Sequence, residues 1–220
     1  VSAAGLAEIS GNQRFAYDAY RRLINMFGNV VMEMNHEHFE KAFDVIKENY
    51  NVTADTDVPA EGLVELCDAY KAVFKEQSGE DFPQDPFRQL ELAIDAVFRS
   101  WNTSRAIRYR EVENIRGLLG TAVNVQSMVY GNMGEDCATG VAFTRDPSTG
   151  QNKLYGEFLV NAQGEDVVAG IRTPEQIIKM KRILPDAYAD FVKVCGQLEK
   201  HYKDMQDVEF TIQQERLWML

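Results

Sequence analysis

Hydrophobic positions recur every three to four residues along most of the first half of the chain, which is the spacing of amphipathic helices. This pattern predicts helices over residues 13–27, 36–50 and 60–77. Charged residues occupy the positions between the hydrophobic ones, so each helix has one face suited to a core and one suited to water. The sequence therefore predicts a small helical subdomain over residues 1–83.

A breaker sequence, Phe82-Pro83-Gln84-Asp85-Pro86, follows these helices and predicts a subdomain boundary. Beyond it the helical spacing resumes over residues 87–101 and again over residues 104–111. We expect the apolar residues of the first of these two helices to face a core. They are Leu90, Ile94, Val97 and Phe98.

The pattern changes at Gly120, where hydrophobic and polar residues begin to alternate. Alternation with a period of two is typical of half-buried strands. It predicts strands over residues 121–130, 140–145, 154–160, 207–212 and 216–220, with helices over 174–184 and 185–206 between them. The predicted fold class is α+β, in which residues 84–130 are connecting helices and a strand, and residues 131–220 form a lobe with an antiparallel sheet.

The composition and net charge indicate which kinds of partner this protein can bind. Hydrophobic residues make up 45% and charged residues 26% of the 220, which is ordinary for a soluble globular protein. Acidic residues outnumber basic ones by 34 to 23, and no block of Lys and Arg offsets the formal charge of -11. Nucleic acid and anionic membranes are therefore not expected as partners. An anionic ligand such as ATP would need a cation and locally aimed donors.

Three scattered cysteines, Cys67, Cys137 and Cys195, form no CxxC pair. They predict neither a disulfide framework nor a zinc site. They favour a reducing compartment inside the cell, with the cytoplasm as the first expectation and an organelle as the second. The chain lacks an initiator Met and ends on the apolar run Leu217-Trp218-Met219-Leu220, from which we expect it to be a fragment.

Two carboxylates stand out in the run Asp207-Val208-Glu209-Phe210-Thr211-Ile212. If the apolar residues of this predicted strand face the core, Asp207 and Glu209 point to the other side, roughly 7 Å apart at the backbone. Their oxygens can converge on Mg²⁺, which takes one or two carboxylates together with phosphate oxygens and water. On the pattern alone, a solvated strand face is the commoner interpretation.

Two other segments are weaker candidates. The run Asn161-Ala162-Gln163-Gly164-Glu165-Asp166 follows a predicted strand and offers side chains able to reach a phosphate-bound metal, but a polar connecting loop explains it equally well. Arg145 ends another strand at a turn, where a guanidinium could hold a phosphate through two hydrogen bonds. More often such an arginine is solvated.

Several motifs taken together resemble the pyruvate, phosphate dikinase family. They occur in order over nearly the whole chain, and the longer ones are specific. They are Gly11-Asn12-Gln13-Arg14-Phe15, Phe82-Pro83-Gln84-Asp85-Pro86, Arg105-Ala106-Ile107-Arg108-Tyr109-Arg110, Gly120-Thr121-Ala122-Val123-Asn124-Val125-Gln126, Thr139-Gly140-Val141-Ala142-Phe143-Thr144-Arg145, the stretch 161–170 and Asp204-Met205-Gln206-Asp207-Val208-Glu209-Phe210-Thr211-Ile212.

The resemblance implies a reaction in which ATP, phosphate and pyruvate give AMP, diphosphate and phosphoenolpyruvate. In this family an ATP-grasp nucleotide domain pyrophosphorylates a histidine on a separate swivelling domain. The phosphohistidine then moves to a TIM-barrel domain, where pyruvate is phosphorylated. The chain resembles the middle and rear of the nucleotide domain, an incomplete ATP-grasp domain. The full-length enzyme is then expected to be a homodimer, and this fragment alone is expected to be inactive.

The resemblance also implies roles for individual residues. Asp207 and Glu209 match carboxylates that contact Mg²⁺ and ATP, and Glu165 matches an acidic position facing the nucleotide. Gln126, Met128 and Val129 match the segment beside adenine, where backbone groups provide hydrogen bonds. Arg145 matches a position from which phosphate contact is plausible.

Three alternatives remain open. A phosphoenolpyruvate synthase shares the later motifs and uses water in place of phosphate, although the helical stretch opened by Gly11-Asn12-Gln13-Arg14-Phe15 resembles the dikinases. A nucleotide-binding module without catalysis is the second alternative. A purely structural or interaction domain is the third, and it is favoured if Asp207 and Glu209 are only solvated surface.

Overall fold

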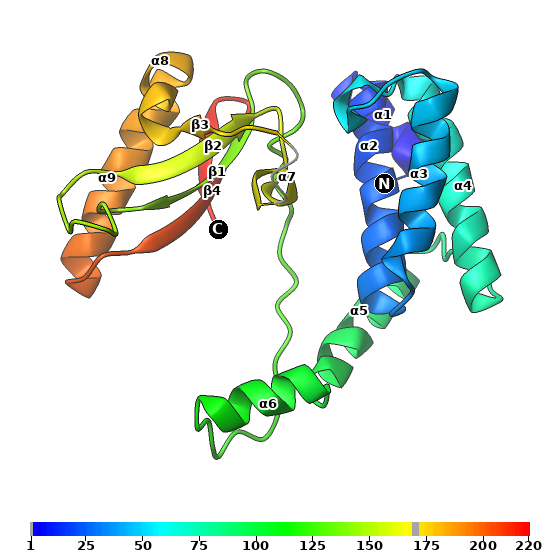
Figure 1. Ribbon diagram of the computed structural model, residues 1–220, viewed down its shortest axis with the longest axis horizontal. Coiled ribbons are helices and arrows are strands. Elements are labelled where there is room, and N and C mark those ends of the chain that lie inside the picture. Colours follow the sequence, from blue (N-terminus) through cyan, green and yellow to red (C-terminus); the bar gives the residue numbers. More distant parts are fainter. Residues whose placement is uncertain (1, 169–171) are drawn as a thin grey trace. The chain divides into compact units, whose positions relative to one another are not determined.

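The computed structural model describes residues 2–168 and 172–220. The chain divides into two compact units, Val1–Val125 and Gln126–Leu220 (Figure 1). The prediction that residues 84–130 form a separate connecting part stays a prediction. Within the described residues, no helix combines the length and the apolar character needed to cross a membrane.

The described part of the first unit is helical. Its elements are α1 (Ala3–Ser10), α2 (Gln13–Met26), the π-helical turn η1 (Phe27–Val31), α3 (His36–Asn49), the 3₁₀ turn η2 (Asp55–Asp57), α4 (Ala60–Ser78), α5 (Pro86–Ser100) and α6 (Ser104–Val112). The three long helices predicted before residue 83 are confirmed, and α1 is an element that the sequence pattern did not predict.

Side-chain caps and a glycine determine where these helices begin and end. The Asn12 side chain accepts a hydrogen bond from the Phe15 N–H at 3.0 Å and satisfies one free donor at the start of α2. At the other end of the subdomain, Gly79 follows α4 with a φ of +76°, a left-handed conformation that glycine adopts without strain.

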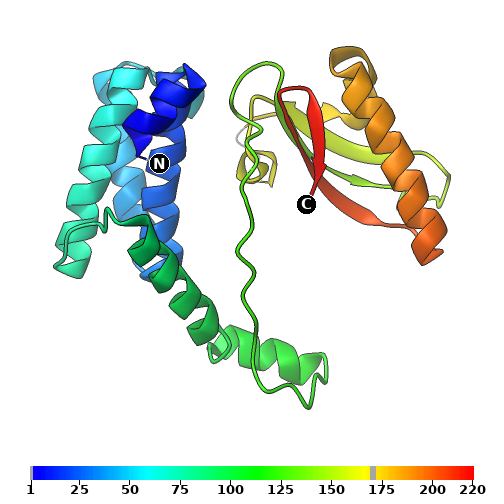
Figure 2. The ribbon, with the colours of Figure 1, turned by 180° about the vertical axis from the view of Figure 1, so that it is seen from behind.

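The core of this unit lies between α2, α3 and α4, which pack together (Figures 1 and 2). Aromatic rings fill much of it. Phe82, the residue before the Pro83 breaker, lies edge-on to Phe27 and Phe74 at centroid distances of 5.5 and 5.3 Å. The breaker segment thus begins with a core residue, which ties the end of the helical subdomain to its centre.

One prediction about the helical unit is wrong. Leu90, Val97 and Phe98 of α5 were expected to face a core, but they are 37%, 39% and 50% exposed, and Ile94 is only partly buried. The physical reason is that helical spacing shows which residues share a face. It does not show that another element covers that face.

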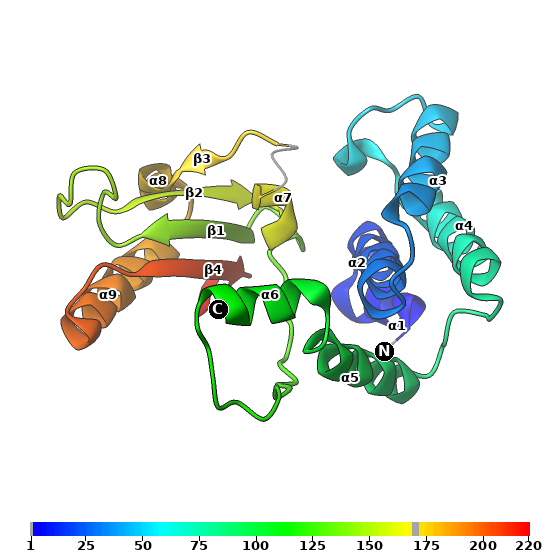
Figure 3. The same ribbon diagram turned by 60° about the horizontal axis from the view of Figure 1, so that its bottom comes forward.

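In the described part of the second unit, five strands form one antiparallel sheet with the order β3-β2-β1-β4-β5. They are β1 (Ala138–Phe143), β2 (Tyr155–Val160), β3 (Glu175–Gln176), β4 (Asp207–Gln213) and β5 (Arg216–Met219). Figure 3 shows β2, β1 and β4 side by side. The predicted α+β class with an antiparallel sheet is confirmed.

The helix α9 (Pro185–Tyr202) covers one face of this sheet. Its Phe191 ring lies 4.6 Å from the ring of Phe210 on β4. Val208 and Ile212, which alternate with Phe210 along the strand, are also buried in this core. The opposite face of β4 therefore carries the remaining side chains, as the period of two requires.

The segment 121–130, predicted as a strand, has no regular secondary structure. A strand needs a neighbour to bond with its N–H and C=O groups. Among residues 2–168 and 172–220, no strand pairs with this segment, so its alternating pattern is not sufficient to make it one.

The predicted helix over residues 174–184 is also wrong in its first part. Glu175 and Gln176 pair with Phe158 and Glu157 as the edge strand β3. Only then does the chain turn through η3 (Ile177–Lys179) into the short helix α8 (Met180–Ile183). Pairing with the free edge of β2 satisfies backbone groups there and overrides the local helical pattern.

A short helix, α7 (Gly164–Val168), replaces the polar loop that was one interpretation of residues 161–166. Leu159 of β2, Ala162 and Val167 form a small core beneath it. Ala169 and Gly170, the last residues of the motif 161–170, lie outside the described residues.

Candidate functional site

The face of the sheet opposite α9 carries both predicted metal-binding carboxylates. Asp207 and Glu209 are exposed on this face of β4, at alternate positions. Among the described residues, neither side chain forms an ion pair or a side-chain hydrogen bond. Two carboxylates free of cationic partners on one strand are a donor set that fits a hard cation such as Mg²⁺.

The pair does not make a complete metal site by itself. In the described part of the chain, no group of three or more His, Cys, Asp or Glu side chains could hold a metal ion. Mg²⁺ commonly takes only one or two carboxylates from the protein, and phosphate oxygens and water complete its shell. The donors therefore fit a cation that arrives with a phosphate-bearing ligand.

The same strand face continues into a cavity of about 380 Å³, within the range of small-molecule sites. Thr211 of β4, two residues beyond Glu209, contributes to its wall. The lining residues are Gln126, Ser127, Met128, Val129, Gly131, Thr139, Gln163, Gly164, Thr211 and Leu220. The cavity thus brings together the predicted residues Gln126, Met128 and Val129, and it joins them to the strand that carries the carboxylates.

Two buried threonines at this cavity were not among the predicted site residues. Thr139 of β1 lies directly opposite Thr211 in the strand register. The Thr139 hydroxyl donates to the Ala162 carbonyl at 2.9 Å, and the two threonine oxygens lie 3.4 Å apart. A hydroxyl has one proton, so Thr211 is the donor in the second contact. The period of two placed Thr211 on this face, but no local signal could have found Thr139.

Gly131 lets the chain pass very close to this pair. A Cβ atom at Gly131 would lie 2.1 Å from Thr139 Oγ1 and 2.3 Å from the Ala162 carbonyl oxygen. Both distances are far below van der Waals contact. The glycine is therefore required by the close approach of the cavity wall to β1.

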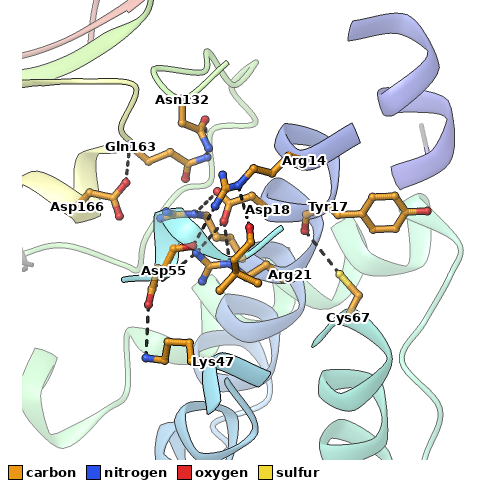
Figure 4. Close-up of polar contacts among 12 residues, drawn as sticks. Arg14, Tyr17, Asp18, Arg21, Lys47, Asp55, Cys67, Asn132, Gln163 and Asp166 are labelled. Atoms are coloured by element: carbon orange, nitrogen blue, oxygen red, sulfur yellow. Dashed lines mark hydrogen bonds and ion pairs between the residues drawn. The ribbon is translucent and has the colours of Figure 1, made fainter. Parts of the chain in front are cut away.

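Glu165 lies beside the cavity and does not line it. It is exposed in the first turn of α7, directly after Gly164, which does line the cavity. The turn before it is held by the Gln163 N–H, which donates to the Asp166 carboxylate at 2.9 Å, and by the Gln163 side-chain amide, which donates to Asn132 at 3.2 Å (Figure 4).

Arg145 lies at the end of β1 near Asp207, and its guanidinium is engaged by a carboxylate of α9. Its Nε and Nη2 atoms donate to the two carboxylate oxygens of Glu199 at 2.7 and 3.2 Å. Glu199 also accepts from the Thr144 hydroxyl at 3.0 Å. The prediction that Arg145 contacts phosphate stays a prediction, and any such contact would compete with this pair.

A second charged cluster lies in the helical unit, within its core (Figure 4). Asp18, only 5% exposed, accepts hydrogen bonds from Arg21 and Arg22 at 2.9 and 3.0 Å. Burial by itself raises the pKa of Asp18, but the two guanidinium groups outweigh burial and the pKa is lowered overall. Asp18 is thus paired with two arginines, so we assign these residues to the stability of the helical unit and not to a binding site.

The three cysteines are buried and none of them is in a disulfide. Burial raises the pKa of Cys67 to about 12 and that of Cys195 to about 11, and it also raises the pKa of Cys137. Almost no thiolate is present near neutral pH at such values, so these thiols are poor nucleophiles.

Comparison with known proteins finds a family that this chain matches. Residues 26–188 match the family model described as pyruvate phosphate dikinase, AMP/ATP-binding domain. The match covers more than half of the chain. The chain belongs to this family.

Individual family members extend the similarity to β4. Pyruvate, phosphate dikinase 1, chloroplastic, of Arabidopsis thaliana is 60% identical over 216 residues, or 98% of the chain. Pyruvate, phosphate dikinase 2 of Zea mays is 59% identical over 218 residues, and the chloroplastic enzyme of Mesembryanthemum crystallinum is 58% identical over 217. The chain spans 22%, 25% and 23% of the lengths of these relatives.

Proposed function

We propose that this chain supplies the ATP-binding part of a pyruvate, phosphate dikinase, and that Asp207 and Glu209 hold the Mg²⁺ that accompanies the ATP. The observation that carries the proposal is the single face of β4, on which the two carboxylates are followed by Thr211 in a cavity wall. A nucleotide laid along this face would have its phosphates near the carboxylates and its base in the cavity.

The residues would then have distinct tasks. Gln126, Met128 and Val129, on the cavity wall, would border the adenine, with hydrogen bonds from their backbone groups. Glu165 would face the nucleotide from the first turn of α7. Mg²⁺, when bound, would screen the negative charge that moves between ATP and the accepting imidazole. The two carboxylates would contribute by holding the cation that keeps the phosphates in line, not by covalent chemistry.

The remaining steps belong to other parts of the full-length enzyme. We propose that ATP transfers its β,γ-pyrophosphoryl group to a histidine on a separate domain and leaves as AMP. Phosphate then takes the terminal phosphoryl group and leaves as diphosphate. The phosphoryl group that remains on the histidine passes to pyruvate on a further domain, which gives phosphoenolpyruvate. We further propose that the enzyme is a homodimer. We also propose a reducing compartment inside the cell, which the scattered spacing of the three cysteines supports.

Removing either carboxylate in the full-length enzyme tests the metal assignment. We expect Asp207→Asn and Glu209→Gln each to lower ATP-dependent phosphorylation of the histidine by roughly a hundredfold or more, because a direct ligand matters at least as much as its outer-shell partners. The measurement is single-turnover transfer of label from ATP at several Mg²⁺ concentrations, together with a thermal unfolding curve.

Glu215→Gln is the matched control. Glu215 is an exposed carboxylate in the turn between β4 and β5, and its variant should phosphorylate at the wild-type rate. Wild-type rates in folded Asp207→Asn or Glu209→Gln enzyme would show that these carboxylates do not hold the metal.

A further inference from the structure

Gln213 is the last residue of β4 and continues the alternation that begins at Asp207 and runs through Glu209 and Thr211. Its side-chain carbonyl accepts a hydrogen bond from the Tyr130 backbone N–H at 2.8 Å. The two residues are 83 positions apart in the sequence, so this bond joins two segments that no local pattern connects.

Tyr130 directly follows the residues that form one wall of the cavity, Gln126 to Val129. These wall residues have no regular secondary structure, so no strand pairing holds them in place. The chain is fixed immediately after them. The Gln213 side chain holds Tyr130, and the Ala162 N–H donates to the Gly131 carbonyl at 2.9 Å. These two bonds anchor the chain at the point where the wall ends.

The two anchors differ in what they connect. The bond from Ala162 ties the wall to the turn after β2, whereas the bond to Gln213 ties it to the strand that carries the carboxylates. Asp207 and Gln213 are six residues apart on one strand, a separation of about 20 Å. Both ends of the candidate site, the carboxylates and the cavity wall, are thus attached to the same strand, β4.

We propose that Gln213 is a positioning residue for nucleotide binding, which fixes the wall 126–129 relative to β4 and so sets the fit of the base. The inference rests on the proposed ATP-binding function. Gln213 itself would not touch the phosphates. It would act through the Tyr130 backbone, which carries the wall.

A matched set of variants in the full-length enzyme tests this role. Gln213→Glu keeps a side-chain acceptor of the same length. Gln213→Leu removes the acceptor, and Gln213→Asn keeps the amide but is too short to reach Tyr130. Because one hydrogen bond at the wall is lost, we expect Gln213→Leu and Gln213→Asn to raise the KM for ATP about tenfold, while kcat at saturating ATP changes less than twofold. The Glu variant should stay within twofold of wild type in both constants.

The discrimination between ATP and GTP supplies a second readout. A displaced wall should reduce the ratio of kcat/KM values for the two nucleotides in the Leu and Asn variants and leave it unchanged in the Glu variant. A residue that only stabilised the β4–β5 hairpin would lower the melting temperature without moving this ratio or the KM. Unchanged KM and unchanged base preference in folded Leu and Asn enzyme would overturn the proposal.

Amide hydrogen exchange at Tyr130 tests the contact without any nucleotide. The Tyr130 amide should exchange at the wild-type rate in the Glu variant and about tenfold faster in the Leu and Asn variants. Equal exchange in all four proteins would overturn the positioning role, whatever the activity. Failure of the Asp207→Asn experiment alone would overturn the metal assignment and leave this contact standing.

Discussion

At the scale of single residues, Arg145 shows why a role cannot be assigned from residue type and position alone. An arginine at the end of a strand suits a phosphate contact, and the sequence suggests no competing partner nearby. The structure supplies one in Glu199, 54 residues away on α9. The pair is bidentate and is extended by Thr144, whose hydroxyl also accepts from the Gln206 N–H at 3.0 Å. Gln206 immediately precedes Asp207, so this cluster anchors the start of β4, the strand that carries the two proposed metal ligands.

A double-mutant cycle on Arg145 and Glu199 measures how strongly the two side chains interact. We expect Arg145→Ala and Glu199→Ala each to lower the free energy of unfolding by about 1–2 kcal/mol, and the two changes to be coupled by about 1 kcal/mol. The measurement is denaturant unfolding of the four proteins.

The exposed pair Arg88–Glu91 provides the control, since both side chains are more than half exposed. Arg88→Ala should change stability by less than about 0.5 kcal/mol. Additive effects at Arg145 and Glu199 would show that the pair contributes nothing. A strongly raised KM for ATP in Arg145→Ala would support the phosphate contact instead.

At the scale of secondary-structure elements, the hydrophobic pattern predicted most of what forms. The helices α2, α3 and α4 and the strands β1, β2 and β4 all follow their expected periods, because each buries its apolar face within its own unit. The failures share one cause. Residues 121–130, 174–184 and the apolar face of α5 have a clear local pattern, but their state depends on which other elements lie beside them, and a local pattern does not contain that information.

Some residues of the candidate site could likewise be predicted from a local pattern, and others could not. The positions of Asp207, Glu209 and Thr211 on one strand face follow from a period of two. The pairing of Thr139 with Thr211 and the bond from Tyr130 to Gln213 join segments more than 70 residues apart, and only the fold reveals them.

Replacing glycine by alanine should change the free energy of unfolding in opposite directions at two positions of the second unit. Gly131→Ala should lower the free energy of unfolding by about 1–3 kcal/mol or more, because its Cβ would overlap Thr139 and the Ala162 backbone. Gly196→Ala should raise it by about 1 kcal/mol, since this position in α9 has open space and alanine favours the helix. Thermal and urea unfolding of both variants would measure the difference. Equal effects of the two substitutions would contradict the close approach at Gly131.

At the scale of the whole molecule, two units with separate hydrophobic cores are joined in one chain that spans 22–25% of the length of its relatives. The site described above lies entirely within the second unit. The proposed reaction also needs a histidine that carries the phosphoryl group, which the proposal places on a separate domain. Catalysis would then depend on parts of the enzyme other than these 220 residues.

The proposed dependence on other domains predicts whether the isolated chain can turn over ATP. The purified 220-residue chain should produce no AMP from ATP at steady state, whereas the full-length enzyme should do so when pyruvate and phosphate are supplied. Quantifying diphosphate and phosphate beside AMP also separates the two candidate activities, since a dikinase releases diphosphate and a synthase releases only phosphate. Steady-state AMP formation by the isolated chain would contradict the proposed dependence on other domains.

The alternation along β4 also determines which changes of length the protein can tolerate. Val208, Phe210 and Ile212 point into the core, while Asp207, Glu209, Thr211 and Gln213 point away from it. Inserting or deleting one residue inside this strand would reverse the facing of every residue on one side of the change, which places polar side chains against the core and apolar side chains on the open face. A point substitution changes one side chain on one face, but a single-residue insertion here would disturb the core and the face with the proposed metal ligands together. Length variation within the family should therefore accumulate in loops such as 144–154 and stay out of β4.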